Sequence, residues 1–223
     1  MAEDRQAGGL GRTGRGVRPP RQQRSAETME RILGATEELL TGDDFEKIPV
    51  TTICATGGVS VSSFYSRFAS KESLLRCLHE RHLERMRADL IDELAAIDWA
   101  DHTTREMVET VIGIYVRSRA VDERLQRTFM LASANDPSYL ERDVELVERV
   151  LVPVALELLR RHPVDDLESW KQRFSLTAWV VCMSAETGMH GPRRFAARLG
   201  LSHDEFIAQL SDLALRNLEI PLT

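Results

Sequence analysis

The sequence is poor in cysteine, and the few cysteines that it has are not arranged to pair or to bind a metal. Cys54, Cys77 and Cys182 are odd in number, lie far apart and form no Cys-x-x-Cys pair. A disulfide framework uses an even set of cysteines, and a structural zinc site uses closely spaced ligands. The sequence therefore argues against both, and we interpret the three thiols as small buried apolar groups.

Long apolar runs are missing as well. The most apolar stretch, Leu176 to Met183, is followed by Ser184 and Glu186. It is too short to span a bilayer, which needs about 20 apolar residues. The N-terminus is rich in Arg, Gly and Pro and has no apolar stretch of the kind found in a secretion signal. These absences predict a cytoplasmic protein.

The motifs that mark common enzymes are also absent. The chain has no Gly-x-Ser-x-Gly, His-Glu-x-x-His or P-loop motif, and no Gly-x-Gly-x-x-Gly in its strand-to-helix context. Its six histidines are scattered without metal-ligand spacing. We therefore expect no enzymatic activity, no cofactor and no metal ion.

The net charge of −6 is distributed unevenly along the chain. Residues 1–24 carry six arginines against Glu3 and Asp4, which gives +4. Residues 1–85 carry 13 basic and 12 acidic side chains, whereas residues 86–223 carry 16 and 23. Because the electrostatic field depends on where charge sits, the acidic total does not exclude a nucleic-acid-binding N-terminal part.

Helical patterning begins near Ser25 and continues through the chain, so we predict an all-α protein. Residues 1–24 contain almost no large apolar side chains and cannot offset the entropy of the chain, so they read as a disordered Arg-rich arm. This arm, a DNA-binding domain over 25–72 and a helical effector-binding and dimerisation domain over 73–223 form the predicted organisation.

The apolar spacing predicts individual helices. The first starts at Ser25 and ends before Gly42. A long one starts at Lys71, is capped by Ser70 and continues past Leu94, which links the two domains. Pro153 should kink the helix that contains it, and Ser202 with Glu205 forms a capping box. The remaining predicted helices are 51–56, 60–67, 104–120, 122–134, 139–161, 166–190 and 203–218.

The segment Thr51 to Arg67 predicts a helix-turn-helix. Two short helices meet at Gly57-Gly58, where one glycine can take the left-handed conformation that a sharp reversal requires. Phe64 and Phe68 are four residues apart and share a buried face. Small outward side chains let a recognition helix approach the floor of the major groove, where hydroxyls bond base edges. These outward residues are Val61, Ser62, Ser63, Ser66 and Arg67. The plain alternative is an ordinary helical pair in an all-α domain.

A family resemblance is carried by the same region. The run Ile53…Gly58-Val59-Ser60…Phe64-Tyr65…Phe68…Ser70-Lys71-Glu72…Leu74 resembles the N-terminal signature of the TetR family of repressors. The match is specific over residues 25–80, about a quarter of the chain, whereas the remainder shares only length and helical layout with the family. The resemblance implies a DNA-binding transcriptional regulator that acts as a repressor.

The resemblance also implies particular DNA contacts. It places phosphate contacts at Thr51, Thr52, Tyr65 and Lys71 and base or near-base contacts at Val61, Ser62 and Ser63, and Ser60 and Arg67 complete the predicted set. The sequence departs from the family at three positions. Ser62 stands where Gly is frequent, Arg67 where His is common, and Gly57 where Ala is usual. These departures bear on the operator sequence more than on DNA binding. Arg67 is always charged and could contact phosphate or guanine bidentately.

A dimer is expected because one recognition helix with a few short side chains cannot supply a preference of about 1,000-fold over non-specific DNA. A twofold dimer implies a palindromic operator with half-sites about one helical turn, or a multiple of it, apart. We predict the interface on the last two helices, although part of each apolar stripe must face the protomer's own core. The predicted interface residues are Trp170, Phe174, Val181, Phe206, Leu210, Leu213 and Leu218.

The resemblance further implies a small-molecule site among the central helices that controls the spacing of the DNA-reading heads. A mixed aromatic and Met surface suits a largely apolar effector, although core packing is the alternative for each candidate. Glu186 could orient a ligand or form an ion pair across the interface. The candidates are His102, Met107, Tyr115, Phe129, Met130, Trp179, Met183 and Glu186.

One function of a different class stays open from the sequence. An architectural or protein-binding helical module would share the helical layout but would lack operator specificity. Uniform binding to unrelated DNA would support that module, whereas operator selectivity would exclude it.

Overall fold

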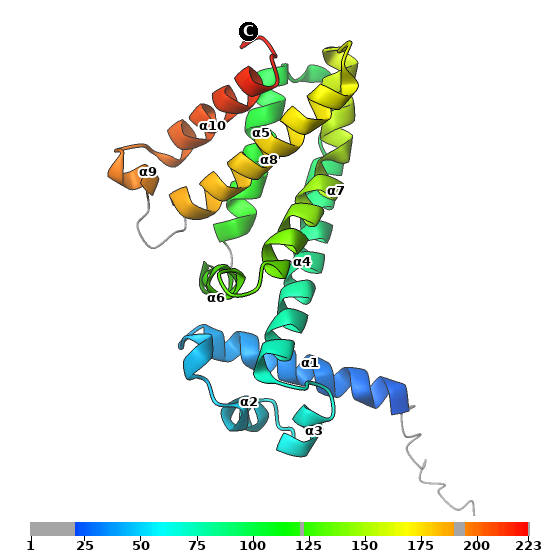
Figure 1. Ribbon diagram of the computed structural model, residues 1–223, viewed down its shortest axis with the longest axis vertical. Coiled ribbons are helices and arrows are strands. Elements are labelled where there is room, and N and C mark those ends of the chain that lie inside the picture. The colour runs from blue at the N-terminus through cyan, green and yellow to red at the C-terminus, as the bar shows by residue number, and fades with distance from the viewer. Residues whose placement is uncertain (1–20, 121–122, 190–194, 223) are drawn as a thin grey trace, which may run out of the picture.

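The fold was analysed in a computed structural model, which describes residues 21–120, 123–189 and 195–222 (Figure 1). These residues form helices and no strand, which confirms the predicted all-α class. The N-terminal part contains α1 (Arg21–Leu40), the 3-10 turn η1 (Phe45–Lys47), α2 (Val50–Thr56) and α3 (Val61–Tyr65). The long helix α4 (Lys71–Ala95) leads from this part to the rest of the protein (Figure 1).

The C-terminal part is a layered group of helices (Figure 1). It comprises the 3-10 turn η2 (Trp99–Asp101), α5 (Thr104–Ala120), α6 (Glu123–Ser133), α7 (Ser138–Arg161), α8 (Leu167–Met189), α9 (Phe195–Arg198) and α10 (His203–Asn217). The predicted spans agree with these helices to within a few residues. The four-residue helix α9 was not predicted, because a single turn is too short to show a period.

The start of α1 differs from the prediction. The helix begins at Arg21, four residues before Ser25, so residues 21–24 of the predicted arm are helical. Arg and Gln have good helix propensity, and they extend a helix that downstream packing already stabilises. Residues 1–20, which make up the rest of the predicted arm, lie outside the described residues.

Local signals explain where the main helices begin. The Ser70 hydroxyl accepts a hydrogen bond from the Ser73 backbone N–H, and the Ser73 hydroxyl accepts one from the Ser70 backbone N–H. Ser202 and Glu205 form the predicted capping box at the start of α10. Pro153 is exposed and lies inside an unbroken α7, so it does not end that helix, and a kink there stays a prediction.

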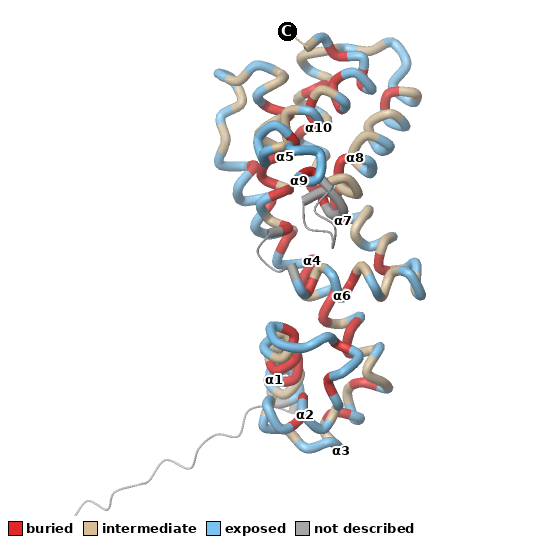
Figure 2. The backbone as a smooth tube through the Cα atoms, turned by 90° about the vertical axis from the view of Figure 1, so that its left-hand side faces the viewer, coloured by how far each residue is buried: buried red, intermediate tan, exposed pale blue. Residues whose placement is uncertain are grey.

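Two separate hydrophobic clusters form the interior, and α4 contributes to both (Figure 2). Leu74, Leu75 and Leu78 lie in the N-terminal cluster, whereas α4 from Leu83 onward lies in the C-terminal one. The N-terminal cluster also takes in side chains of α6 and α7, namely Leu125, Phe129 and Tyr139. The N-terminal cluster therefore includes side chains from beyond residue 72, where the sequence predicted the end of the first domain. These side chains come from the first turns of α4 and from α6 and the start of α7.

No helix in the described part of the chain is both long enough and apolar enough to cross a bilayer.

Candidate nucleic-acid interface and small-molecule cavity

The reversal between α2 and α3 depends on Gly58. Its φ is +58°, in the left-handed region that favours glycine, whereas Gly57 has an ordinary φ of −73°. The backbone N–H of Val59 donates to the Cys54 carbonyl at 2.9 Å and closes the turn. Arg31 of α1 donates to the Gly58 carbonyl at 2.5 Å. The turn is therefore tied to α1, as a fixed helix-turn-helix requires.

Helix α3 separates an inner from an outer face. Phe64 is fully buried and Phe68 nearly so, and both pack with Ile53 of α2. Val61 is 40% exposed and Tyr65 56% exposed. The Tyr65 ring packs edge to face on the ring of Phe64, with centroids 5.2 Å apart, and this contact orients it. The predicted buried Phe face is confirmed. Of the residues predicted to point outward, Val61, Ser62 and Ser66 are exposed, whereas Ser63 and Arg67 are half-buried.

The serines at the start of α3 stabilise the helix, in addition to the DNA contacts predicted for them. Ser60 caps α3, since its hydroxyl accepts the Ser63 backbone N–H at 3.1 Å. The Ser60 hydroxyl also lies 2.9 Å from that of Ser62 and 2.8 Å from that of Ser63. Ser60 and Ser62 are exposed and Ser63 is half-buried. Ser60, Ser62 and Ser63 thus form one hydroxyl cluster at the start of α3.

Arg67 and Lys71, the two cationic residues predicted to contact DNA, form hydrogen bonds within the protein. The half-buried Arg67 donates to the Ser63 carbonyl at 2.9 Å and to the Ser25 carbonyl at 3.3 Å, which joins the end of α3 to α1. The Lys71 ammonium donates to the carbonyls of Phe45 and Glu46 and lies 4.4 Å from the Phe45 ring centre. Burial lowers the pKa of Lys71, against the raising effect of nearby glutamates.

Thr51 and Thr52 are both exposed in the first turn of α2. Of the nine predicted DNA-contacting residues, those exposed at the surface are therefore Thr51, Thr52, Ser60, Val61, Ser62 and Tyr65, while Ser63, Arg67 and Lys71 are half-buried.

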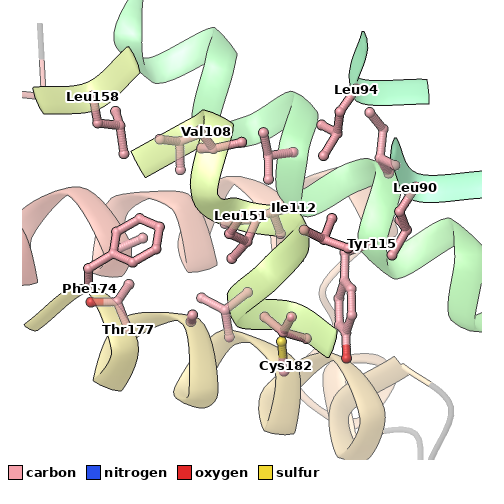
Figure 3. Close-up of a pocket in the computed structure, with 18 of the residues that line it drawn as sticks. Leu90, Leu94, Val108, Ile112, Tyr115, Leu151, Leu158, Phe174, Thr177 and Cys182 are labelled. Carbon is pink, nitrogen blue, oxygen red and sulfur yellow. The ribbon is translucent and has the colours of Figure 1, made fainter. Parts of the chain in front are cut away.

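The C-terminal part contains an apolar cavity of about 80 Å³ among α4, α5, α7, α8 and α10 (Figure 3). No Asp, Glu, Lys or Arg lines it. The hydroxyl of Thr177, one of its few polar lining groups, donates to the Arg173 carbonyl at 2.7 Å and accepts from Asn217 at 2.7 Å. Tyr115 is the predicted ligand residue that lies in the lining.

A small groove of about 20 Å³ adjoins this cavity between α7 and α8. Three of the predicted ligand residues, Tyr115, Trp179 and Met183, line it. It shares four lining residues with the cavity, namely Tyr115, Val147, Ala178 and Cys182. The groove also contains the carboxylates of Asp143 and Glu148, which the sequence analysis did not single out.

Four predicted ligand residues lie elsewhere. His102 lies beside η2, with its Nδ1 3.0 Å from the Asp98 carbonyl oxygen. Met107 is fully buried in the C-terminal cluster, and Phe129 packs in the N-terminal cluster. The helical period predicted that both side chains point inward, but it did not show which cluster each one joins. Met130 is half-buried on α6 and lines neither the cavity nor the groove. The side chain of Glu186 lies outside the described residues.

The residues predicted for the dimer interface lie mostly inside the protomer. Trp170, Phe206 and Leu210 are buried in the C-terminal cluster, as are Val181 and Leu218, and Phe174 lines the cavity. Only Leu213 is exposed, at 58%. The apolar stripes of α8 and α10 are used by the protomer's own core, because both helices pack on α5.

Most of the cavity residues that the sequence did not single out are aliphatic. They come mainly from α5 and α7, and helical periodicity gives them the same pattern as ordinary core residues. No signal in the sequence distinguishes a residue beside a cavity from one in close packing. Examples are Leu90, Leu94, Val150, Leu151, Val154 and Leu158.

Polar contacts join α4 to α6 and α7 between the two parts. The buried His79 has its Nε2 3.1 Å from Asp143 Oδ1 of α7 and packs against the rings of Phe129 and Tyr139. The Nε2 of His82 lies 2.5 Å from Gln126 Nε2 of α6. Burial, aided by the charges of Arg119 and Arg85, lowers the pKa of His82 to about 3. His82 is therefore neutral at physiological pH.

The geometry of α2 and α3 defines the class of protein. Two short helices meet at a left-handed glycine, are held on α1 by a common core, and expose short polar side chains and a tyrosine. This arrangement is a helix-turn-helix of the DNA-binding type.

Comparison with known proteins shows a family similarity in the N-terminal part of the chain. A profile described as "Bacterial regulatory proteins, tetR family" matches residues 32–78. The "HTH-type transcriptional regulator UidR" of Escherichia coli (strain K12) is 27% identical over 93 residues, which are 42% of this chain and 45% of the relative. The chain thus matches about half the length of these curated relatives. Residues 32–78 of the chain are thus similar to bacterial regulatory proteins of the TetR family.

Solved structures extend the similarity of the fold to most of the chain. Salmonella enterica GusR has a TM-score of 0.60 at 18% identity, over 86% of this chain and 95% of that one. FadR from Bacillus subtilis, in complex with stearoyl-CoA, has a TM-score of 0.55 at 15% identity, over 85% and 96% of the two chains. The dihydroxyacetone kinase operon activator DhaS has a TM-score of 0.55 at 16% identity, over 86% and 96%. At these identities the likeness concerns the fold alone.

Proposed function

We propose that this chain is a DNA-binding transcriptional regulator of the TetR family, which binds a palindromic operator as a homodimer, represses transcription from it, and releases it when a small-molecule effector binds. The observation that carries the proposal is the outer face of α3, where Tyr65 and Val61 are exposed over a fully buried Phe64. A large apolar ring on a monomer's surface favours a binding role for that surface.

The proposed DNA contacts follow from exposure. Val61 and Ser62 face outward at the start of α3 and would meet base edges or a thymine methyl group. Thr51, Thr52 and Tyr65 would bind phosphates. Ser60, Ser63, Arg67 and Lys71 mainly hold the helices in place, and each could add a phosphate contact with a remaining hydrogen-bonding group.

The proposed dimer surface consists of Leu176 and Val180 on α8 and Leu213 on α10, which we call the α8–α10 surface. All three side chains are exposed, at 55%, 38% and 58%. The two helices pack against each other, and Asn217 of α10 donates to Thr177 of α8 at 2.7 Å. A symmetric pairing of this surface would form a four-helix bundle, which the buried residues first predicted from the sequence cannot form.

The proposed release mechanism depends on α4. Leu74 and Leu78 of this helix pack in the core of the DNA-binding part, and Leu90 and Leu94 line the cavity. A cavity of about 80 Å³ is smaller than a typical ligand site of roughly 300–1,000 Å³, so an effector must widen it. A ligand that binds better to the widened state draws the population away from the state that binds DNA.

Binding to selected genomic fragments tests the proposal. Fragments bound by the full-length protein are isolated, and the affinity for one of them is compared with that for unrelated duplexes of equal length and salt. We expect a palindromic site bound by two chains, with a preference of about 1,000-fold or more. Equal affinity for unrelated DNA would instead support the architectural module. A reporter gene behind the site is expected to be expressed more strongly when the regulator is deleted.

A further inference from the structure

We propose that the effector is an amphiphilic cation, with its apolar part in the central cavity and its positive charge in the groove between α7 and α8. This inference rests on the proposed function, because it names the chemical class of the effector that would control DNA binding. Three features carry it, namely the charge of the groove, its aromatic walls and the lining residues that it shares with the cavity.

The charged residues in the described lining of the groove are both acidic. They are Asp143 and Glu148 of α7, and no Lys or Arg is among the described lining residues. Glu148 is exposed and makes no ion pair within the described residues. By contrast, none of the described residues that line the central cavity is charged. A ligand that extends from the cavity into the groove therefore meets hydrocarbon first and carboxylates afterwards, which suits an apolar body with a cationic end.

Two aromatic rings add to this preference. Tyr115 of α5 lines both the cavity and the groove, and Trp179 of α8 lines the groove and is 44% exposed. The faces of Trp and Tyr attract ammonium groups, including quaternary ones that cannot donate hydrogen bonds. An acidic site with aromatic walls selects a cation over a neutral molecule of the same shape.

The groove and the cavity are separated by a thin wall. Both are lined by Tyr115, Val147, Ala178 and Cys182, so displacement of these side chains would join the two spaces. Figure 3 shows Tyr115 and Cys182 together at one end of the cavity, with Phe174 and Leu158 toward the other. The charged end of the ligand is therefore assigned to the Tyr115 end and its apolar body to the Phe174 end.

An anionic ligand is disfavoured by the same geometry. Among the described residues the buried Arg or Lys side chain is Arg119, whose guanidinium carbon lies 5.7 Å from the Tyr115 ring centre. Arg119 is directed to Met86 of α4, with Nη1 3.2 Å from the sulfur, and lines neither the cavity nor the groove. Residues 86–223 also carry 23 acidic against 16 basic side chains, so the electrostatic field of this part attracts cations.

The position of Asp143 connects recognition to DNA binding. Its carboxylate lines the groove and also pairs with the buried His79 of α4 at 3.1 Å. His79 packs against Phe129 of α6 and Tyr139 of α7, which belong to the N-terminal cluster. A cation in the groove competes with His79 for Asp143 and weakens this link between α4 and α7. The carboxylate that recognises the ligand thus also holds the DNA-binding part in position.

Three probes with the same six-carbon chain separate the possible classes. Hexyltrimethylammonium, hexanoate and hexan-1-ol are titrated into the full-length protein, and binding is followed by calorimetry without DNA. We expect the ammonium compound to bind about tenfold or more tightly than either of the others. Hexanoate or hexan-1-ol binding as tightly, or no binding of the ammonium compound, would overturn the proposal.

Single substitutions then test whether the ammonium group of the ligand lies beside Glu148. Glu148→Gln is expected to weaken hexyltrimethylammonium binding about fivefold and to leave hexan-1-ol binding unchanged. The matched control is Glu141→Gln, which neutralises an exposed carboxylate on the same helix outside the groove. An equal effect of the two substitutions, or none from either, would overturn the assignment.

Operator binding distinguishes failure of this inference from failure of the proposed function. The ligand-free protein is first tested for operator affinity, and that result concerns the proposed function alone. Asp143→Asn, which weakens the pairing with His79, is then expected to change the ligand-free operator affinity about threefold or more. It should also reduce the further effect of hexyltrimethylammonium. An unchanged affinity together with an unchanged ligand response would refute the coupling role of Asp143.

Discussion

At the scale of single residues, the DNA-binding part depends on a few side chains whose neighbours fix their role. Tyr65 is exposed, yet its ring is oriented by Phe64 beneath it. Lys71 has the residue type of a phosphate contact, but its ammonium is directed to backbone carbonyls of η1. Residue type suggests a contact, whereas neighbouring atoms decide whether the group is free to make it.

Tyr65→Phe tests the proposed phosphate contact. The ring and its packing on Phe64 are kept, while one hydroxyl is lost, so the free energy of unfolding should stay within about 0.5 kcal/mol of the parent. A hydrogen bond to a charged phosphate is worth about 1.5–3 kcal/mol, so affinity for operator and unrelated DNA should fall together by about tenfold or more. Fluorescence anisotropy at fixed salt measures both affinities. Unchanged binding to both DNAs would contradict the contact.

Ser62→Ala is the matched comparison on the same helix. It removes a hydroxyl from the proposed base-reading surface and leaves Tyr65 in place. We expect the ranking of operator variants to change while affinity for unrelated DNA remains within about twofold of the parent. A uniform loss across all sequences would instead assign Ser62 to phosphate binding.

His82 predicts a pH dependence of stability. Its pKa lies at about 3 in the folded protein, below its ordinary value of 6.5, because it is buried and near Arg119 and Arg85. The stability linked to neutral His82 is therefore fully present above pH 6.5 and is lost as the pH falls from 6.5 toward 3. At pH 5 the loss is about 2 kcal/mol. Urea unfolding at pH 7 and pH 5 should show a smaller loss for His82→Gln, and equal losses would contradict the prediction.

At the scale of elements, the helices follow from local signals, and the turn between α2 and α3 follows from one backbone conformation. The caps at Ser70 and Ser202 were readable because a capping residue and its partner lie three positions apart. The diglycine predicted a reversal without showing which glycine is left-handed. Gly58 takes that role, with Arg31 beside its carbonyl.

Gly58→Ala and Gly34→Ala form a matched pair. At Gly58 a Cβ atom would require the left-handed backbone and would lie 2.6 Å from Arg31 Nη2. Gly34 is in α1, and no atom outside that helix's own backbone lies within 4 Å of its ideal Cβ position. We expect Gly58→Ala to lower the free energy of unfolding by about 1–2 kcal/mol and Gly34→Ala to raise it by up to about 1 kcal/mol. Denaturant unfolding checks both, and equal effects would refute the role of the turn.

At the scale of the whole molecule, one long helix joins the DNA-binding part to the cavity. Helix α4 contributes to both cores, and α6 and the start of α7 pack against the DNA-binding part as well. The two parts are therefore coupled through packed side chains as well as through the chain connection. A ligand that changes the spacing of α4 and α7 at the cavity would act on this shared packing.

The α8–α10 surface gives a prediction about assembly. Val180→Glu with Leu213→Glu places charge on side chains that are exposed in the protomer, so the fold should persist while a dimer dissociates. Sedimentation equilibrium is expected to change from two chains to one, with unchanged helical circular dichroism and weaker operator binding. Leu131→Glu on α6, also exposed, is the control and should leave the assembly intact. A double variant that remains dimeric would place the interface elsewhere.

The sequence by itself determined the helical class, most helix spans and the helix-turn-helix, because periodicity, caps and turns depend on residues within a few positions of one another. The tertiary structure decided which apolar stripes are internal. It placed Trp170, Phe206 and Leu210 inside the protomer and left Val180 and Leu213 outside. It also brought Asp143 to both His79 and the groove. Such contacts join residues far apart in the chain, and the helical period predicts which face is buried but not which helix or subunit packs against it.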